Sequence, residues 1–406
     1  MRILIIHQNF VDHRHPGGTR HLDVATRLVA KGHEVTVVAS TVDYLTGTQI
    51  KAPRQETYKG VVIKRAWALP TVQKSIAWRA ISYVSYLPAA WWTALRSGPA
   101  DVVFGTTPPV FQLPPTWLIA KMRRAPFVLE VLDLWPEFAI GMGVLKNPVL
   151  IWIARTVEQF FNHAAKHLIV NSPAYKDYLI DHGRQADDVT TIVNGVDPEM
   201  FEPDEGANEI RRRFRLDGKF VVTYSGALGM ANDLSTIVRA ANLVQDDPDI
   251  HFLLAGDGKE RTKLEAEAKA LNLTNITFGG FFPKDQMKNV LAASDACVAT
   301  LLDIPQFKTP FPNKVFDYMT AGKPVLLGID GAIRKVVDEA NAGIFVQPGN
   351  EQSLADAVRH LKANPDEAKA MGQRGQQHIV SHYHMDRQAD RFEEVFLKVV
   401  QRKSRR

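Results

Sequence analysis

The residue types best suited to chemistry gather in one stretch, 312–319, whose sequence is PNKVFDYM. Lys314 and Asp317 are three positions apart, so a helix would place both on one face near its N-terminus. An ammonium group is unfavourable at that end of a helix unless an anion sits there too. A diphosphate would satisfy both charges, and the carboxylate could accept hydrogen bonds from ribose hydroxyls, as in dinucleotide-binding folds. On spacing alone, an ordinary solvent-exposed Lys/Asp pair remains the alternative.

Three glycine loops follow predicted strands. The first contains Gly17 and Gly18, the second runs from Gly226 to Gly229, and the third holds Gly256 and Asp257. Glycine lets backbone N–H groups approach a phosphate or a sugar at a helix N-terminus. Each loop alone is compatible with a plain tight turn, but three of them at strand ends favour a role in binding an anion.

Short apolar runs alternate with longer amphipathic segments, which predicts parallel sheets covered by helices. At 406 residues the chain exceeds the size at which one hydrophobic core usually stops growing. The alternation breaks in a polar stretch near 197–218, so we expect two doubly wound Rossmann-like α/β domains, 1–200 and 201–384. A last helix within 385–406 would cross back to the first domain and end in a basic tail. The expected strands are 2–8, 34–39, 61–65, 101–105, 126–131, 167–171 and 190–193, then 219–225, 250–255, 275–278, 295–299, 324–328 and 343–346.

The composition is that of a globular protein, with 45% hydrophobic and 23% charged residues. The lone cysteine, Cys297, excludes an intramolecular disulfide and lies in an apolar run, which indicates a buried thiol. The apolar start of the chain is too short for a signal peptide and has no cleavage site after it. We therefore interpret it as a buried strand of a cytoplasmic protein.

The first half of the chain is basic and contains all seven tryptophans, a combination that an anionic membrane surface attracts. Residues 80–95 are uncharged, rich in aromatic residues and interrupted by Pro88. Such a segment is marginal for crossing a bilayer of about 30 Å. Its basic flanks suit a helix in the headgroup region, so residues 74–96 are expected to contact the inner membrane surface. A buried helix kinked at Pro88 is the alternative. No nucleic-acid partner is expected, because no binding motif is found.

A resemblance emerges from these motifs. The 312–319 stretch and the run DLWPE at 133–137 resemble the retaining glycosyltransferases of the large family numbered four, which have the GT-B fold of two facing Rossmann-like domains. More narrowly, they are similar to bacterial enzymes of surface-polysaccharide assembly. The nearest subgroup is the N-acetyl-L-fucosamine transferases of O-antigen and capsule synthesis. The similarity covers nearly the whole chain.

The resemblance implies a role for each motif. It implies that Gly17 and Gly18 border the donor diphosphate and sugar, that the loop from Gly226 to Gly229 holds the nucleotide diphosphate, that Lys314 neutralises it, and that Asp317 binds the ribose. The loop from Thr309 through Pro312 and Asn313 to Lys314 would cover the donor sugar, and Gly256 and Asp257 would complete the donor site. Asp133 and Glu137 would lie at the acceptor side and are, with Lys314, the candidate catalytic residues.

Two positions depart from the family pattern. Many members have two glutamates separated by seven residues, where this chain has Thr309 and Asp317. Many also have a basic residue after the second glycine loop, where this chain has residues 230–233, MAND. Arg20 or Lys308 is a candidate for supplying that charge.

The function that the resemblance implies is transfer of a sugar from a nucleoside-diphosphate sugar, UDP-linked, to a lipid-linked or saccharide acceptor, with retention at the anomeric carbon. Fixed positive potential at the departing diphosphate would supply most of the catalysis. No cofactor and no metal are expected, since the only Asp-x-Asp, 247–249, has the pattern of a turn. The alternatives are a nucleotide-sugar epimerase of the same fold and a non-enzymatic membrane-associated scaffold. An NAD-dependent dehydrogenase is disfavoured, because no full Gly-x-Gly-x-x-Gly follows a strand.

Overall fold

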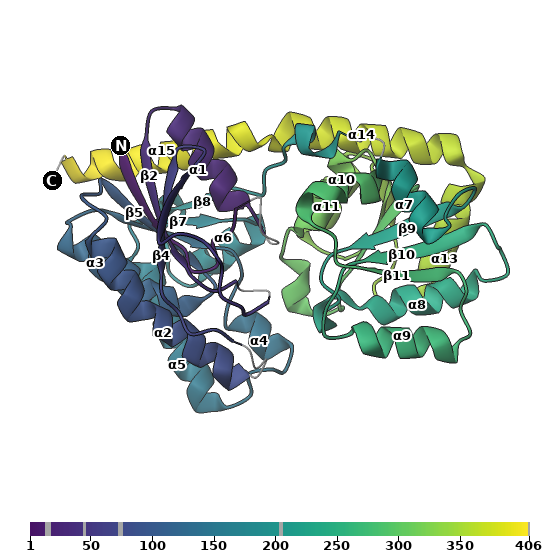
Figure 1. Ribbon diagram of the computed structural model, residues 1–406, viewed down its shortest axis with the longest axis horizontal. Coiled ribbons are helices and arrows are strands. Elements are labelled where there is room, and N and C mark those ends of the chain that lie inside the picture. Colours follow the sequence, from purple (N-terminus) through teal and green to yellow (C-terminus); the bar gives the residue numbers. More distant parts are fainter. Residues whose placement is uncertain (13–17, 44–45, 72–75, 203–205, 405–406) are drawn as a thin grey trace. The chain divides into compact units, whose positions relative to one another are not determined.

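The computed structural model describes residues 1–12, 18–43, 46–71, 76–202 and 206–404. It divides into two compact units, each with its own sheet. Unit 1 consists of Met1–Gly195 together with Met385–Arg406, and unit 2 is Val196–His384 (Figure 1). The chain thus enters unit 2 at Val196, and its C-terminal segment belongs to unit 1.

Unit 1 is built on an eight-stranded sheet of order β3-β4-β2-β1-β5-β6-β7-β8. Its strands are parallel except β3, which pairs antiparallel with β4 at the edge. Strand β3 was not predicted, because its residues, QETY, are mostly polar and partly exposed. The strands are β1 (Arg2–Ile6), β2 (Glu34–Ser40), β3 (Gln55–Tyr58), β4 (Val61–Ala66), β5 (Val102–Thr107), β6 (Phe127–Val131), β7 (His167–Val170) and β8 (Val189–Thr191).

Alternate residues of β1 enter two separate cores, one on each face of this sheet. Leu4 and Ile6 pack in a cluster with residues of α2 (Ile76–Leu95), α3 (Leu113–Met122) and α5 (Pro148–Ala164). Ile3 and Ile5 pack in a second cluster with α1 (Arg20–Ala30) and α15 (Met385–Ser404). Because successive side chains of a strand point to opposite faces, both faces are covered, as in a doubly wound fold. The shorter helices are α4 (Glu137–Gly141), α6 (Pro173–Asp181) and the 3₁₀ turns η1 (Val110–Gln112) and η2 (Ala186–Asp188).

The C-terminal helix α15 is fixed to unit 1 by apolar and ionic contacts. Phe392 and Phe396 pack edge-on against Phe104 of β5. Lys31, just after α1, pairs with Asp390 and Glu393 of α15. The helix therefore completes the core of unit 1 on the α1 side.

Unit 2 has a six-stranded, wholly parallel sheet of order β11-β10-β9-β12-β13-β14. The expected strands of this half all form, each within two residues of the predicted ends. They are β9 (Phe220–Ser225), β10 (Ile250–Ala255), β11 (Ile276–Gly280), β12 (Ala296–Thr300), β13 (Val325–Gly328) and β14 (Gly343–Phe345). The helices are α7 (Gly206–Phe214), α8 (Leu234–Leu243), α9 (Arg261–Ala270), α10 (Lys284–Ala292), α11 (Asn313–Thr320), α12 (Ala332–Glu339), α13 (Glu351–Ala363) and α14 (Pro365–Tyr383), with 3₁₀ turns η3 (Pro198–Phe201), η4 (Met230–Asn232) and η5 (Pro305–Lys308).

The aromatic segment 80–95 forms most of α2, which continues through Pro88. One side of the helix is core: Tyr86 is fully buried, and its hydroxyl donates to the Val38 carbonyl at 2.9 Å. The other side carries Val84 and Trp92, which are about half exposed. The interpretation as a buried helix therefore fits one side of the segment, and contact of the other side with a membrane stays a prediction. No helix in the described part of the chain is both long and apolar enough to cross a membrane.

Candidate active site

The second-domain glycine loop and the start of α11 meet around the amine of Lys314. Its Nζ donates to the Tyr224 hydroxyl at 2.6 Å and to Asn232 Oδ1 at 3.0 Å. It also lies 4.0 Å from the centre of the Tyr224 ring, within range for a cation–π contact. Within the described residues, Lys314 forms no ion pair with a carboxylate. Its charge is therefore held by neutral groups only.

This neutral setting changes the acidity of the amine. Burial lowers the pKa of Lys314 from its ordinary value of 10.5 to about 7, since no nearby anion compensates for the lost water. An ammonium group has three N–H donors, and the protein occupies two of them. The third donor and the uncompensated charge suit an anionic ligand.

Gly226 keeps space open beside this amine. Its φ of +132° lies in the region that favours glycine. A Cβ at this position would lie 3.5 Å from Lys314 Nζ and 3.6 Å from the Tyr224 hydroxyl oxygen. Any side chain here would extend into the space around the ammonium group, so the loop leaves room there for a ligand.

Only part of the 226–229 loop can offer backbone donors. The Gly226 N–H donates to the Ala255 carbonyl and the Leu228 N–H to the Asp257 carbonyl, both at 3.0 Å. Within the described residues, the N–H groups of Ala227 and Gly229 have no such partner. The loop thus has two amide donors to give, next to the lysine that α11 supplies.

The backbone of the third glycine loop packs directly against that of the second. A Cβ on Gly256 would lie 1.8 Å from the Gly226 carbonyl oxygen, so glycine is needed at 256 for backbone packing. Asp257 accepts the Gly258 N–H at 2.7 Å and lies 3.7 Å from the Arg261 guanidinium. Gly256 and Asp257 therefore have a structural role in the unliganded protein. Their contact with a sugar donor stays a prediction.

Asp317 lies one turn after Lys314 on α11 and is partly buried. Burial raises the pKa of its carboxyl to about 6, against the smaller lowering effect of Lys284. In the described part of the chain this carboxylate accepts no hydrogen bond from a side chain or backbone N–H. Pro312 precedes the helix and Asn313, its first residue, is exposed. An unsatisfied, partly buried carboxylate is well suited to accept ligand hydroxyls.

The residues considered for a second cation are already engaged. Arg20 donates to Glu130 Oε1 at 2.9 Å and to the carbonyls of Val193 and Ile192 at 2.6 and 2.5 Å. Lys308 is half exposed and lies 3.5 Å from Asp303. Asn232 stands in the 230–233 segment that lacks a basic residue, and its amide bridges Lys314 and the Ala227 carbonyl. A fixed neutral amide therefore occupies that place in this chain.

In unit 1, the two predicted acceptor-side acids lie in different environments. Asp133 follows β6, and burial raises the pKa of its carboxyl to about 7. Glu137, at the start of α4, forms a two-point ion pair with Arg155, with N–O distances of 2.7 and 3.0 Å. Asp133 is thus poised to exchange a proton near neutral pH, whereas Glu137 is held by its partner.

The buried carboxylate of Glu130, the partner of Arg20 in unit 1, was not predicted from the sequence. Glu130 of β6 is fully buried and accepts from Arg20 and from His21 Nε2, the latter at 2.5 Å. Burial alone would raise the pKa of Glu130, but Arg20 and His21 outweigh it and hold the pKa below its usual range. The ring centre of His7 lies 4.3 Å from that of His21 with the rings tilted by 56°, and burial lowers the pKa of His7 well below the usual value. The available signal was a glutamate inside the apolar strand FVLEV.

Of the first glycine loop, Gly18 precedes α1, and among the described residues no atom lies within 4 Å of the place that a Cβ would take. Gly17 falls outside the described residues.

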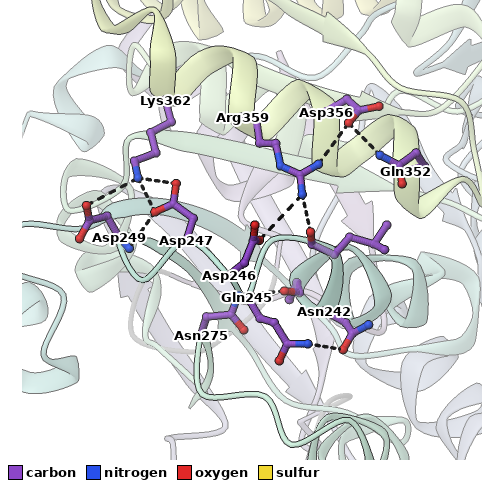
Figure 2. A network of polar contacts seen from close by, with 12 residues as sticks. Asn242, Gln245, Asp246, Asp247, Asp249, Asn275, Gln352, Asp356, Arg359 and Lys362 are labelled. Atoms are coloured by element: carbon purple, nitrogen blue, oxygen red, sulfur yellow. Dashed lines mark hydrogen bonds and ion pairs between the residues drawn. The ribbon is translucent and has the colours of Figure 1, made fainter.

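The Asp-x-Asp segment 247–249 is a turn between α8 and β10, held by lysine (Figure 2). Lys362 of α13 donates to both carboxylate oxygens of Asp247, at 2.5 and 2.6 Å, and lies 3.7 Å from Asp249. The Asp249 N–H donates to Asp247 at 3.1 Å. The segment precedes β10, so it lies at the sheet edge opposite the glycine loops. Among the described residues, no three metal-ligating side chains gather at one place.

Both units match known protein families. Residues 17–195 match the family described as "Glycosyl transferase 4-like domain", and residues 207–378 match "Glycosyl transferases group 1". The two matches divide at the boundary between unit 1 and unit 2. The chain is a glycosyltransferase.

Curated relatives of the glycosyltransferase have low sequence identity to it, but the similarity extends over most of the chain. It is 25% identical over 336 residues to the putative colanic acid biosynthesis glycosyl transferase WcaI of Escherichia coli (strain K12), covering 79% of this chain and 82% of that protein. It is 26% identical to the probable glycosyltransferase WbjE of Pseudomonas aeruginosa, covering 66% and 67%.

Solved structures share its fold. Anabaena Alr3699/HepE in complex with UDP-glucose aligns with a TM-score of 0.75 at 20% identity, covering 98% of this chain and 100% of that one. Sucrose-phosphate synthase from Thermosynechococcus elongatus aligns with a TM-score of 0.76 at 18% identity, covering 98% of each chain. These likenesses confirm the predicted GT-B fold.

Proposed function

We propose that this glycosyltransferase transfers a sugar from a UDP-linked donor, with retention and without a metal, to a lipid-linked or saccharide acceptor in bacterial surface-polysaccharide synthesis. The observation that carries the proposal is the uncompensated amine of Lys314 beside the open space at Gly226. A diphosphate supplies the anion that this amine lacks. The relative WcaI, named a putative colanic acid biosynthesis glycosyl transferase, and the structural neighbour HepE, solved in complex with UDP-glucose, agree with this chemistry.

The chemistry follows from where charge develops. In glycosyl transfer the bond from the anomeric carbon to the diphosphate breaks, leaving positive charge on the sugar ring and negative charge on the leaving group. Lys314 and the free N–H groups of Ala227 and Gly229 would stabilise that negative charge, a contribution that grows in the transition state. Asp317 would accept hydrogen bonds from the ribose hydroxyls and so fix the register of the nucleotide.

The acceptor hydroxyl must lose a proton as it attacks. Asp133, whose pKa burial raises to about 7, is the proposed residue of unit 1 for receiving it. Glu137 would act with Arg155 to hold α4. The donor sugar is proposed to be N-acetyl-L-fucosamine, on the resemblance of the 312–319 and 133–137 motifs. The sugar transfer is proposed to take place at the inner face of the cell membrane.

A donor panel tests the proposal. Wild-type protein is incubated with UDP-N-acetyl-L-fucosamine, UDP-glucose, UDP-N-acetylglucosamine and GDP-mannose, each with and without a polyprenyl-diphosphate-linked saccharide. Acceptor-dependent release of UDP and a lengthened saccharide are expected, and both should be lost in Lys314→Ala. Conversion of the donor sugar without an acceptor would instead indicate the epimerase, and absence of nucleotide binding would indicate a scaffold.

A further inference from the structure

The apolar surface of unit 1 is concentrated on one layer of helices. The layer consists of α2, α3 and α5, which follow one another in contact, with Trp117 of α3 packed edge-on against Phe160 of α5. Most of the large hydrophobic side chains that are exposed in the described residues lie on or next to these helices. They are Ile81, Val84, Trp92 and Leu95 on α2, Leu118 and Met122 on α3, Val144 before α5, and Val149, Leu150, Trp152, Ile153 and Phe160 on α5.

Helix α5 is the extreme case, because large apolar side chains lie on its exposed side although its buried side, with Phe161, already packs in the core. Val149, Trp152, Ile153 and Phe160 recur at helical spacing, and their exposed fractions are 61%, 67%, 43% and 51%. The opposite side of the helix buries Glu158, which accepts from Asn162 at 3.2 Å. A surface helix ordinarily turns its apolar stripe inward, so something outside the protein must cover this one.

The charges around the layer identify what covers it. The helices α2 and α3 contain no acidic residue, and the single acid of α5 is the buried Glu158. Five exposed basic residues lie on these helices or just before or after them in the sequence: they are Arg96, Lys121, Arg124, Lys146 and Lys166. The Arg96 guanidinium lies 4.2 Å from the Trp92 ring centre, and the Lys121 amine 5.8 Å from that of Trp117. Apolar side chains rimmed by cations suit an anionic bilayer surface. A second copy of the same face would oppose like charges.

We propose that the outer face of α2, α3 and α5, with Trp152 of α5 as a principal anchor, inserts into the headgroup region of an anionic membrane. This deepens the proposed function and rests on it in one respect, since it names the surface that brings the enzyme to a lipid-linked acceptor. It also moves the predicted contact beyond residues 74–96 to a helix that the sequence did not single out. Trp91, by contrast, packs against the core.

Vesicle co-sedimentation of the full chain tests the surface. We expect binding to vesicles of phosphatidylcholine with phosphatidylglycerol, weaker binding to phosphatidylcholine alone, and a decrease with added salt. The double variant Val149→Ser/Trp152→Ser should bind the anionic vesicles at least about tenfold more weakly. Phe281→Ser is the matched control, because Phe281 is an exposed aromatic residue of unit 2, 55% accessible, and should leave binding unchanged.

Three outcomes would overturn the proposal. The first is that the double variant binds anionic vesicles as tightly as the wild type does. The second is that the wild type does not bind anionic vesicles. The third is a lipid-free dimer that the double variant dissociates, because the face would then be an interface between copies. UDP affinity, measured without lipid, reports on the donor site separately: if the double variant keeps it while losing vesicle binding, the two sites are independent.

Discussion

Lys314 makes the donor site sensitive to pH in a direction that can be worked out. Burial lowers the pKa of its amine to about 7, so the unliganded protein loses the charge as pH rises through 7. A bound diphosphate favours the ammonium form and raises that pKa. Nucleotide affinity is therefore highest at and below pH 7 and falls at higher pH, by up to tenfold per pH unit, until the pKa of the complex is reached.

The magnitude follows from the same linkage. If the complex has a pKa above 9, UDP affinity should fall about ten- to fiftyfold between pH 7 and pH 9, or roughly 1.4 to 2.3 kcal/mol. The lower value allows for the part of the Lys314 side chain that stays in contact with solvent. Above pH 7 the terminal phosphate, whose pKa is about 6, is already ionised and contributes little to the slope.

Calorimetric titration of the protein with UDP at pH 7, 8 and 9, at constant ionic strength, measures this effect. Lys314→Arg is the control, because a guanidinium stays protonated throughout this range and reveals any titration of the ligand itself. A wild-type affinity that is flat from pH 7 to pH 9 would refute the reasoning. An equal slope in the arginine variant would refute it too, since the titrating group would then be another one.

Three further changes have expected outcomes. Lys314→Met should stabilise the unliganded protein at pH 6 by about 1–3 kcal/mol of unfolding free energy, and so raise its melting temperature, because it removes a partly buried, unpaired charge. Since the folded-state pKa is the lowered one, this gain should shrink between pH 7 and pH 10 in a scanning-calorimetry series. Glu130→Gln should cost about 3–5 kcal/mol in urea unfolding by leaving Arg20 buried without its partner, whereas Glu137→Gln, at a more exposed ion pair, should cost under about 1 kcal/mol. Asp317→Asn should weaken UDP binding about tenfold but change 2′,3′-dideoxy-UDP binding little, and an equal loss for both would place Asp317 away from the ribose.

The fold was predictable because each buried parallel strand is a short apolar run between turns. The six strands of unit 2 formed where the runs lie, whereas β3 was missed because an edge strand need not be apolar. The candidate site was predictable in part. Lys314 and Gly226 were proposed from their residue types and positions. The packing of Gly256 against the Gly226 carbonyl could not be predicted, since no sequence pattern shows which backbone segments cross.

Side-chain partnerships account for most of what the sequence left open. Arg20 was a reasonable candidate for a phosphate contact until the structure placed Glu130 against it. Those two residues are 110 positions apart and meet only because β6 lies in the same sheet as the strand that leads to α1. Long-range pairing of this kind depends on sheet order, which the local pattern of residues does not encode.

The same physical reasoning links the two proposed sites. A folded chain normally compensates each buried charge and covers each apolar stripe, because failing to do so costs free energy. Lys314 is partly buried among neutral groups, and the stripe containing Val149 and Trp152 faces outward while Glu158 faces inward. Each arrangement is unfavourable in the isolated protein and becomes favourable with one kind of ligand, a diphosphate in the first case and an anionic bilayer in the second. Lys314→Met should stabilise the protein and abolish only diphosphate binding, and Val149→Ser/Trp152→Ser should make it more soluble and abolish only vesicle binding. Both results together would measure the free-energy cost of each feature and identify the ligand that it serves.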